Sequence, residues 1–373
     1  MKTILILAND ETTIYNFRRE LLRRLVQEKY RVVVCFPEGG KTQNIIDIGC
    51  EFLDIVISRH GINPVNEIKL LLEYRRILKA VKPDLVLTYT IKPNIYGSLA
   101  CQLAKVPYIN NVTGLGSVFA KRKALQKFLL FLQKRAYKQS NCVFFQNKDN
   151  YLFFQNKGIV TGNMRHIPGS GVNLGLHKFE EYPPEGAMLK FITVSRVRAD
   201  KGFNELFEAA KRIKCKYGQV EFHVVGWFEE QVYESIVQQL VNEKILIYHG
   251  IKSQEEVHYF IKECHCLVHP SHHEGMANVL LEGAACGRPV IASAIPGCQE
   301  AFEEGISGFG FEVKDDMDLE NKLARFIEMP YLEKAKMGWA GRQKIEKEFD
   351  RNIVVNAYLE EIEKAIGNHI KKG

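Results

Sequence analysis

The stretch HPSHHEGMANVLLE, residues 269–282, brings together several side chains that could do chemistry. Two carboxylates, Glu274 and Glu282, stand eight residues apart, and His269, His272 and His273 precede the first of them. These residue types could form a metal site, an acid/base pair, or a cradle that grips a ligand without reacting with it.

The local pattern around these residues predicts a strand at CLVHP, a loop at SHHEG and a helix over MANVLLEGAACG. If both glutamates were helical, they would lie about 12 Å apart along the axis and roughly 80° apart around it. Carboxylates so placed cannot share one ion or one proton, but they can contact the two ends of an extended ligand. The amides of Met276, Ala277 and Asn278 at the helix N-terminus favour an anion between them. An anionic centre between two hydroxyl-rich ends describes a nucleotide diphosphate sugar.

Two other interpretations of this stretch stay open. Zinc sites commonly use HExxH on a helix, whereas the order here is H-x-x-H-H-E with Pro270 interrupting any helical spacing. Loop ligands could still converge, so a metal-dependent hydrolase built on His269, His272 and His273 is one alternative. The other is a helix N-terminus with an incidental pair of glutamates.

A second group of charged residues lies in SRVRADKGF, residues 195–203, after the strand KFITVS. Arg196, Arg198 and Lys201 fall in a strand-to-helix loop, where strand-end loops line a ligand site. Arg196 could pair with diphosphate oxygens bidentately and Lys201 as a point charge. Taken alone, the motif would equally suit a basic loop in solvent.

The elements that must position these groups alternate between strand-like apolar runs and amphipathic helical stretches in both halves of the chain. This alternation predicts an α/β protein with two Rossmann-like doubly wound domains facing a cleft. We expect an acceptor-binding domain over 1–170, a Gly- and Pro-rich linker over 171–188, a donor domain over 189–350 and a C-terminal helix over 351–373 that could cross back to the first domain. Neither half contains GxGxxG or GxxxxGK[ST], so the sequence has no motif for dinucleotide binding or ATP hydrolysis.

The composition further limits the class of protein and the partners that we expect. Residues 1–186 hold 27 Lys and Arg against 15 Asp and Glu, whereas the remainder holds 24 against 29, so the N-terminal half prefers an anionic partner. The nine cysteines are scattered, which is typical of reduced thiols in a cytosol. No signal peptide or apolar stretch of spanning length is evident, and we expect a cytoplasmic protein that is soluble or peripheral.

With both motifs in view, the chain resembles the family-four retaining glycosyltransferases of the GT-B fold. The resemblance is carried by Arg196 with Lys201 in SRVRADKG, by E-x7-E from Glu274 to Glu282, and by PVIASAIPGCQEAF and GISGFGF beyond them. The first half resembles a narrower group, which extends undecaprenyl-diphosphate-linked glycans, through TIYNFRRELLRRL, SRHGINP, TYTIKPNIYGSLA and NVTGLGSVF. Within that group, N-acetylgalactosaminyltransferases of surface polysaccharide (capsule, O-antigen) or glycoprotein synthesis are the most similar.

The resemblance implies a role for each matching position. Arg196 and Lys201 would bind the donor diphosphate, Glu274 the sugar hydroxyls and Glu282 the ribose, while backbone near Ile251 would meet uracil. Donor contacts are also implied at Gly275, Met276, Ala277, Asn278 and Val279. The family's glycine pair after the first strand is missing, and Tyr15 stands near that point; on the acceptor side, Thr113 and Gly114 are the candidates.

In this family the transfer retains anomeric configuration and requires no metal or further cofactor besides the UDP-sugar. The implied reaction moves a hexose or N-acetylhexosamine, with N-acetylgalactosamine favoured, from a UDP-sugar to a polyprenyl-diphosphate-linked glycan. A UDP-sugar epimerase of the same fold and a non-catalytic sugar-nucleotide sensor are the remaining alternatives.

A basic helix is predicted over KRKALQKFLLFLQKRAYK, residues 121–138, with seven Lys or Arg and no acid. Leu125, Phe128, Leu129, Leu132 and Ala136 follow helical spacing, so this helix could lie on the anionic inner face of the cytoplasmic membrane. The plainer interpretation is a helix packed on its own sheet with lysines in water. Motifs of the common nucleic-acid binders are absent, and we expect no nucleic-acid partner.

Overall fold

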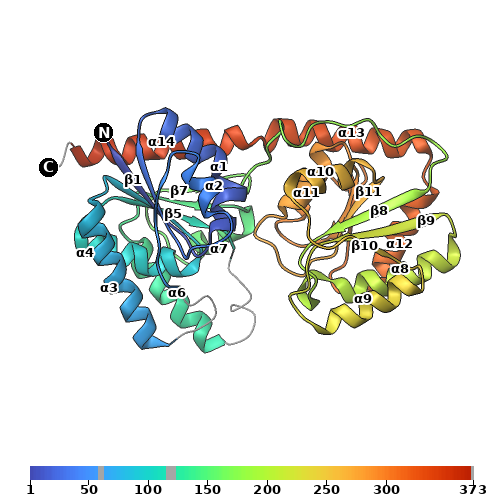
Figure 1. Ribbon diagram of the computed structural model, residues 1–373, viewed down its shortest axis with the longest axis horizontal. Coiled ribbons are helices and arrows are strands. Elements are labelled where there is room, and N and C mark those ends of the chain that lie inside the picture. Colours follow the sequence, from blue (N-terminus) through green and yellow to red (C-terminus); the bar gives the residue numbers. More distant parts are fainter. Residues whose placement is uncertain (58–62, 115–122, 371–373) are drawn as a thin grey trace. The chain divides into compact units, whose positions relative to one another are not determined.

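The computed structural model describes residues 1–57, 63–114 and 123–370 and divides the chain into two compact units. The first unit comprises Met1–Ser170 and Arg351–Gly373, and the second comprises Gly171–Asp350. Figure 1 shows that each unit is a sheet with helices on both faces. The predicted pair of doubly wound α/β domains is confirmed.

The first unit contains a parallel sheet in the order β3-β2-β1-β4-β5-β6-β7. Its central strands are buried on both faces: Ile4 and Ile6 of β1 contribute to one apolar core, and Leu5 and Leu7 to another. α1 and α14 cover the first of these faces, and α3 and α4 cover the second. The strands are β1 (Thr3–Leu7), β2 (Arg31–Cys35), β3 (Glu51–Leu53), β4 (Leu85–Tyr89), β5 (Tyr108–Val112), β6 (Cys142–Phe145) and β7 (Met164–His166). The helices are α1 (Glu11–Gln27), α2 (Thr42–Ile46), α3 (Pro64–Val81), the π-helical turn η1 (Pro93–Gly97), α4 (Ser98–Ala104), α6 (Lys123–Tyr137), α7 (Lys148–Asn156) and α14 (Arg351–Ile370).

The second unit repeats this plan with a parallel sheet in the order β10-β9-β8-β11-β12-β13. α8, α9 and α12 share one apolar core, and α10 and α11 share the other. The strands are β8 (Leu189–Val194), β9 (Val220–Val225), β10 (Ile247–Tyr248), β11 (Cys266–His269), β12 (Val290–Ser293) and β13 (Gly308–Phe311). The helices are the 3₁₀ turn η2 (Ala199–Lys201), α8 (Phe203–Lys216), α9 (Val232–Asn242), α10 (Gln254–Lys262), α11 (Asn278–Ala285), the 3₁₀ turn η3 (Gln299–Ala301), α12 (Asp316–Glu328) and α13 (Tyr331–Glu348).

The C-terminal helix α14 belongs to the first unit. Val354, Tyr358 and Ile362 join its core, and the Asn111 side chain donates a hydrogen bond of 2.5 Å to the Tyr358 hydroxyl. The chain therefore passes between the units twice, after Ser170 and after Asp350.

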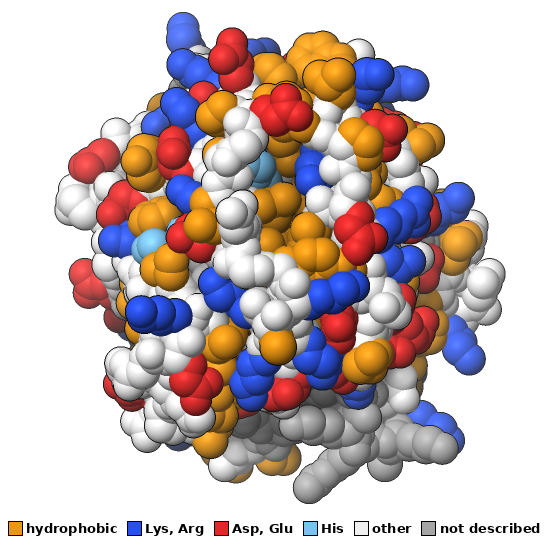
Figure 2. All heavy atoms as spheres, turned by 90° about the vertical axis from the view of Figure 1, so that its right-hand side faces the viewer, with side chains coloured by type: hydrophobic (Ala, Val, Ile, Leu, Met, Phe, Trp, Pro, Cys, Tyr) orange, Lys and Arg blue, Asp and Glu red, His pale blue; other side chains and the backbone are white. Residues whose placement is uncertain are grey.

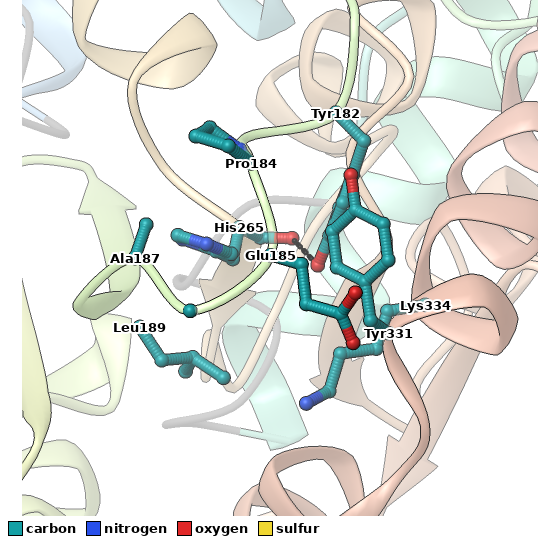
Figure 3. A pocket seen from close by; sticks show the side chains of 9 residues that line it. Tyr182, Pro184, Glu185, Ala187, Leu189, His265, Tyr331 and Lys334 are labelled. Carbon is teal, nitrogen blue, oxygen red and sulfur yellow. Dashed lines mark hydrogen bonds between the residues drawn. The ribbon is translucent and has the colours of Figure 1, made fainter.

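Residues 171–188, expected to be a linker, pack on the second unit instead. The fully buried Arg288 guanidinium donates to the carbonyls of Glu180 and Glu181, and the Tyr182 hydroxyl donates to the carbonyl of His265 at 3.1 Å. Figure 3 shows the pocket that this segment lines together with Tyr331 and Lys334 of α13. Composition rich in Gly and Pro predicts irregular backbone, and it does not reveal that the backbone's carbonyls are held by a buried arginine.

The basic helix over 121–138 corresponds to α6, and residues 121–122 lie outside the described part of the chain. Leu129 and Ala136 are buried, whereas Phe128 and Phe131 are about half exposed. The predicted apolar stripe is thus divided, because part of it packs on the helix's own unit. Among the described residues, no helix is long and apolar enough to cross a bilayer.

Candidate functional site

The two charged motifs meet at the C-terminal ends of two neighbouring strands. β8 pairs with β11 in parallel, so the loop after β8, which carries Lys201, lies beside the loop after β11, which carries Glu274. The Lys201 ammonium donates to the Glu274 Oε1 at 2.5 Å and lies 3.4 Å from the Ser271 Oγ. The topology therefore joins residues that are 73 positions apart in the sequence.

A glycine allows this close approach. Gly202 has a φ of +72°, and a Cβ at this position would lie 1.9 Å from the carbonyl oxygen of Pro270. Beside it, the His272 amide donates to the Asp200 carbonyl at 2.9 Å. Any side chain at residue 202 would push the two loops apart and separate Lys201 from Glu274.

Glu274 is held in its ionised form. Its burial alone would raise the pKa of the carboxyl, but the hydrogen bond from His269 and the charge of Lys201 outweigh burial and lower the pKa to about 2. The His269 Nε2 lies 2.9 Å from the Glu274 Oε1. Glu274 is thus a hydrogen-bond acceptor over the whole physiological pH range, which suits it to bind hydroxyl groups.

The two arginines of the first motif share a carboxylate. Arg196 and Arg198 lie 2.8 and 2.9 Å from the two oxygens of Glu229, which follows β9, and Arg198 also pairs with Asp200. Arg196 is the more exposed of the two, with 43% of its side chain accessible. Arg196 therefore offers its remaining donors to a ligand, while Arg198 is engaged from two sides.

The start of α11 differs from the sequence-based expectation in two ways. Glu274 is not helical, since α11 begins at Asn278 and only Glu282 lies on it, so the separation calculated for two helical glutamates does not apply. The Ala277 amide donates to the Gly297 carbonyl at 2.8 Å and is therefore not a free amide at the N-terminus. Gly275 and Met276 belong to the preceding loop, and Asn278 and Val279 form the first residues of the helix.

The other donor-side candidates also belong to the second unit. Glu282 lies on α11, with its Oε1 3.9 Å from the His177 Nε2. Ile251 follows β10 and is 71% exposed.

The candidates of the first unit have different surroundings. Tyr15 lies on α1 between two cations, with Arg19 and Lys41 at 5.2 and 5.5 Å from its ring centroid. Thr113 and Gly114 directly follow β5 and border residues 115–122, outside the described part of the chain.

The three histidines of the opening stretch do not converge. His269 pairs with Glu274, His272 pairs with Glu205 at 3.0 Å, and His273 is exposed. Over the described ranges, no three potential metal ligands that include one of these histidines lie within 4.8 Å of one another. The geometry therefore gives the hydrolase alternative no metal centre.

Three contacts of the site were not predicted from the sequence. Glu229 holds both arginines, and His269 orients Glu274. The carbonyl of Gly297 accepts the hydrogen bond of the Ala277 amide. Glu229 and His269 stand at the ends of strand-like runs, in VVGWFEE and CLVHP, and this placement was the available signal.

Two doubly wound parallel sheets, with charged loops at the strand ends of the second, define a protein of the GT-B fold. Residues 178–344 match the family model "Glycosyl transferases group 1", and residues 3–147 match "Glycosyl transferase 4-like". The chain belongs to these glycosyltransferases.

Individual proteins agree with this assignment. The chain is 27% identical to the N,N'-diacetylbacillosaminyl-diphospho-undecaprenol alpha-1,3-N-acetylgalactosaminyltransferase of Campylobacter jejuni, covering 97% of this chain and 98% of that one. It is 24% identical to the UDP-Gal:alpha-D-GlcNAc-diphosphoundecaprenol alpha-1,3-galactosyltransferase of Escherichia coli, covering 81% of each. The structure of Anabaena Alr3699/HepE in complex with UDP and glucose has the same fold, with a TM-score of 0.78 and 17% identity over 97% of this chain and 99% of that one.

Proposed function

We propose that the protein transfers a hexose or N-acetylhexosamine, with N-acetylgalactosamine favoured, from a UDP-sugar to a polyprenyl-diphosphate-linked glycan, with retention of anomeric configuration. The observation that carries the proposal is the Lys201–Glu274 pair, which holds a cation and an ionised carboxylate side by side at the ends of β8 and β11. A nucleotide diphosphate sugar offers the matching groups, an anionic diphosphate next to a ring of hydroxyls.

The proposed chemistry depends on charge and position. The bond from the anomeric carbon to the diphosphate oxygen breaks while a bond to the acceptor oxygen forms on the same face, and the leaving phosphate takes the acceptor's proton. Lys201 and Arg196 would stabilise the charge that grows on the diphosphate, and Glu274 would hold the sugar hydroxyls. With two cations at the diphosphate, the transfer step needs no metal ion.

The acceptor class rests on the relatives. The matched Campylobacter jejuni and Escherichia coli enzymes both carry a diphospho-undecaprenol in their names, and the first spans nearly the whole of this chain. A role in surface polysaccharide synthesis is supported by the name of a Staphylococcus aureus relative, the capsular polysaccharide biosynthesis glycosyltransferase CapM, which is 24% identical over 86% of this chain.

A panel of UDP-sugars tests this function against lipid-diphosphate saccharide acceptors. We expect acceptor-dependent release of UDP, greatest with UDP-N-acetylgalactosamine, an axial glycosidic linkage in the product by NMR, and a rate unchanged by added Mg²⁺ or Mn²⁺. Conversion of a UDP-sugar without acceptor would support an epimerase instead, and binding without turnover on any acceptor would support a sensor.

A peripheral site on the inner membrane face follows from the lipid-linked acceptor, and the first unit has a surface that fits it. α3, α4 and α6 pack side by side, as Figure 1 shows. They expose large apolar side chains: Val65, Ile68 and Leu72 on α3, Leu103 on α4, and Phe128 and Phe131 on α6. The same helices expose cations, among them Lys69 on α3 and Lys127 and Lys134 on α6. Apolar side chains amid lysines are suited to an anionic bilayer surface.

Vesicle sedimentation tests this surface. Replacing Phe128 and Phe131 with Ser should release the protein from vesicles that contain phosphatidylglycerol while leaving transfer to a short, water-soluble acceptor unchanged. A matched control replaces Val232 and Leu332, which are exposed apolar residues of the second unit, and should bind vesicles like the unaltered protein. Equal binding by both variants would contradict the proposed surface.

A further inference from the structure

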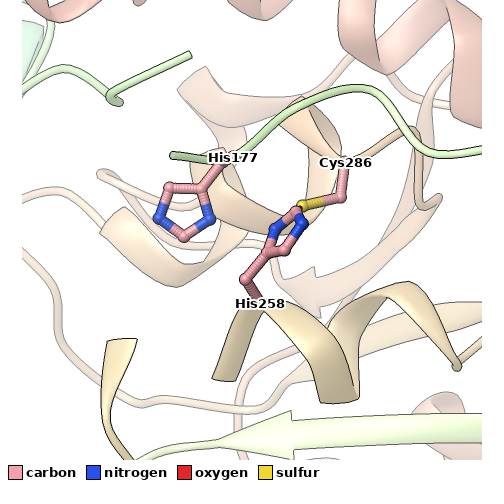
Figure 4. Close-up of side chains that lie close together, drawn as sticks. All are labelled: His177, His258 and Cys286. Carbon is pink, nitrogen blue, oxygen red and sulfur yellow. The ribbon is translucent and has the colours of Figure 1, made fainter. Parts of the chain in front are cut away.

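A cluster of potential metal ligands lies in the second unit, apart from the three histidines discussed above. His177, His258 and Cys286 each place one ligand atom within 4.8 Å of the other two, and Figure 4 shows the three side chains directed toward one another. The Cys286 Sγ lies 3.2 Å from the His258 Nδ1, and the two imidazole rings are 5.7 Å apart at 69°. Only the fold unites them, because they come from the coil over 171–188, from α10 and from the end of α11.

The surroundings of the cluster resemble those of a built metal site. His177 and Cys286 are 2% and 0% exposed, and His258 retains 17% exposure of its side chain, which leaves a path for entry. The outer nitrogen of His258, Nε2, lies 3.1 Å from a carboxylate oxygen of Glu180. Metal-bound histidines usually donate their second N–H to such a carboxylate, which turns the other nitrogen toward the ion.

The hydrogen bonds of His258 indicate which of its ring nitrogens donates and which accepts. With Nε2–H donating to Glu180, the His258 Nδ1 is a lone-pair acceptor directed at the Cys286 thiol. An entering divalent ion would form bonds to Sγ and Nδ1 and release the thiol proton to solvent.

We propose that His177, His258 and Cys286 bind one zinc ion that fastens the coil over 171–188 to α10 and α11. One thiolate and two imidazoles suit zinc better than magnesium, calcium or manganese, which prefer oxygen ligands. Zinc bonds of about 2.0–2.3 Å place tetrahedral ligand atoms roughly 3.5 Å apart, close to the spacing of Cys286 and His258. The ion is structural and takes no part in bond formation. It lies beside the proposed donor site, since the His177 Nε2 is 3.9 Å from the Glu282 Oε1, but zinc binding can be measured without donor or acceptor.

Metal analysis of the full chain tests the site. After incubation with Zn²⁺ and gel filtration, we expect about one zinc per chain, with His258→Ala and Cys286→Ser reduced to less than about one fifth of that. Glu180→Gln, which keeps a hydrogen-bond acceptor but removes the charge, should weaken zinc binding about tenfold in competition with a chromogenic chelator. Cys215→Ser, at an exposed cysteine of α8, is the matched control and should retain the full zinc content.

Cobalt substitution gives a second measurement that does not depend on how well a variant folds. Co²⁺ added to the unaltered protein should produce a thiolate-to-cobalt absorption band, and addition of Zn²⁺ should abolish it. Zinc content that is equal in the His258→Ala, Cys286→Ser and Cys215→Ser variants would overturn the proposal. So would a cobalt complex that lacks the thiolate band.

Discussion

The two units have the same central topology and use their strand ends in opposite ways. In the first unit, Thr88 near the end of β4 is buried and hydrogen-bonded to two buried asparagines, Asn94 of η1 and Asn110 of β5. At the corresponding place in the second unit, the ends of β8 and β11 present Lys201, Glu274 and an exposed Arg196. The doubly wound sheet thus supplies a position for a site, and the side chains decide whether a site is built there.

The distribution of charged side chains on the surface also differs from one part of the molecule to another. Figure 2 shows a face on which positive and negative side chains are interspersed around hydrophobic ones. In contrast, α6 of the first unit carries Lys and Arg and no acidic residue. α6 therefore contributes four cations and no anion to the basic excess of the N-terminal half, which favours attraction to an anionic surface.

The largest expected effect concerns the charged pair of the second unit. Lys201→Ala and Glu274→Gln should each reduce kcat/KM for the UDP-sugar by about 10³-fold, because each removes a preorganised charge from the proposed donor site. Thr88→Val, at the corresponding strand end of the first unit, should change it less than about threefold per properly folded molecule. Full activity of the Lys201→Ala variant would show that sugar transfer does not depend on the loops after β8 and β11.

The next effect concerns stability of the first unit. The Tyr358 ring is 1% exposed and lies 4.4 Å from the Phe144 ring, centroid to centroid. Tyr358→Ala should lower the free energy of unfolding of this unit by roughly 3–4 kcal/mol, since it leaves a large cavity and an unpaired Asn111 amide. Hydrogen exchange should show faster opening in β1, β4 and β6 and little change in β8 to β13. Uniform loss of protection would mean that the two units unfold together.

A smaller effect depends on pH and belongs to the second unit. His265 is buried, and its Nδ1 accepts a hydrogen bond from the Lys190 amide at 3.2 Å, which only the neutral ring can do. Burial, followed by the charges of Arg288 and Lys334, lowers the pKa of His265 from 6.5 to about 4. The unfolded chain therefore binds the proton first, and stability is lost as the pH falls from about 6.5 toward 4.

The pH effect is about 2 kcal/mol between pH 7.5 and pH 5. His265→Asn, which keeps an acceptor but does not titrate, should remove that part of the pH dependence in chemical denaturation. An unchanged difference between the two pH values would contradict the assignment to His265.

The smallest effect separates the two arginines that share Glu229. Arg196→Ala should raise KM for the UDP-sugar about tenfold, whereas Arg198→Ala should raise it about twofold, because Arg198 is already held by Glu229 and Asp200. Steady-state kinetics with variable donor concentration measures both values. The reverse order would make Arg198 the diphosphate ligand.

The sequence by itself determined the alternating α/β elements and the two charged motifs with their glycosyltransferase pattern. These features are local, because apolar periodicity and loop residues reflect the strand or helix that contains them. It also placed Lys201 and Glu274 in loops after strands, and the parallel pairing of β8 with β11 then brought those loops together.

Contacts between distant segments were decided only by the tertiary structure. Packing sets residues 171–188 on the second unit, occupies the Ala277 amide with Gly297, and turns His269 toward Glu274. It also unites His177 with Cys286, which lie more than a hundred positions apart. No local period encodes such pairs, since their formation depends on how whole helices and strands pack.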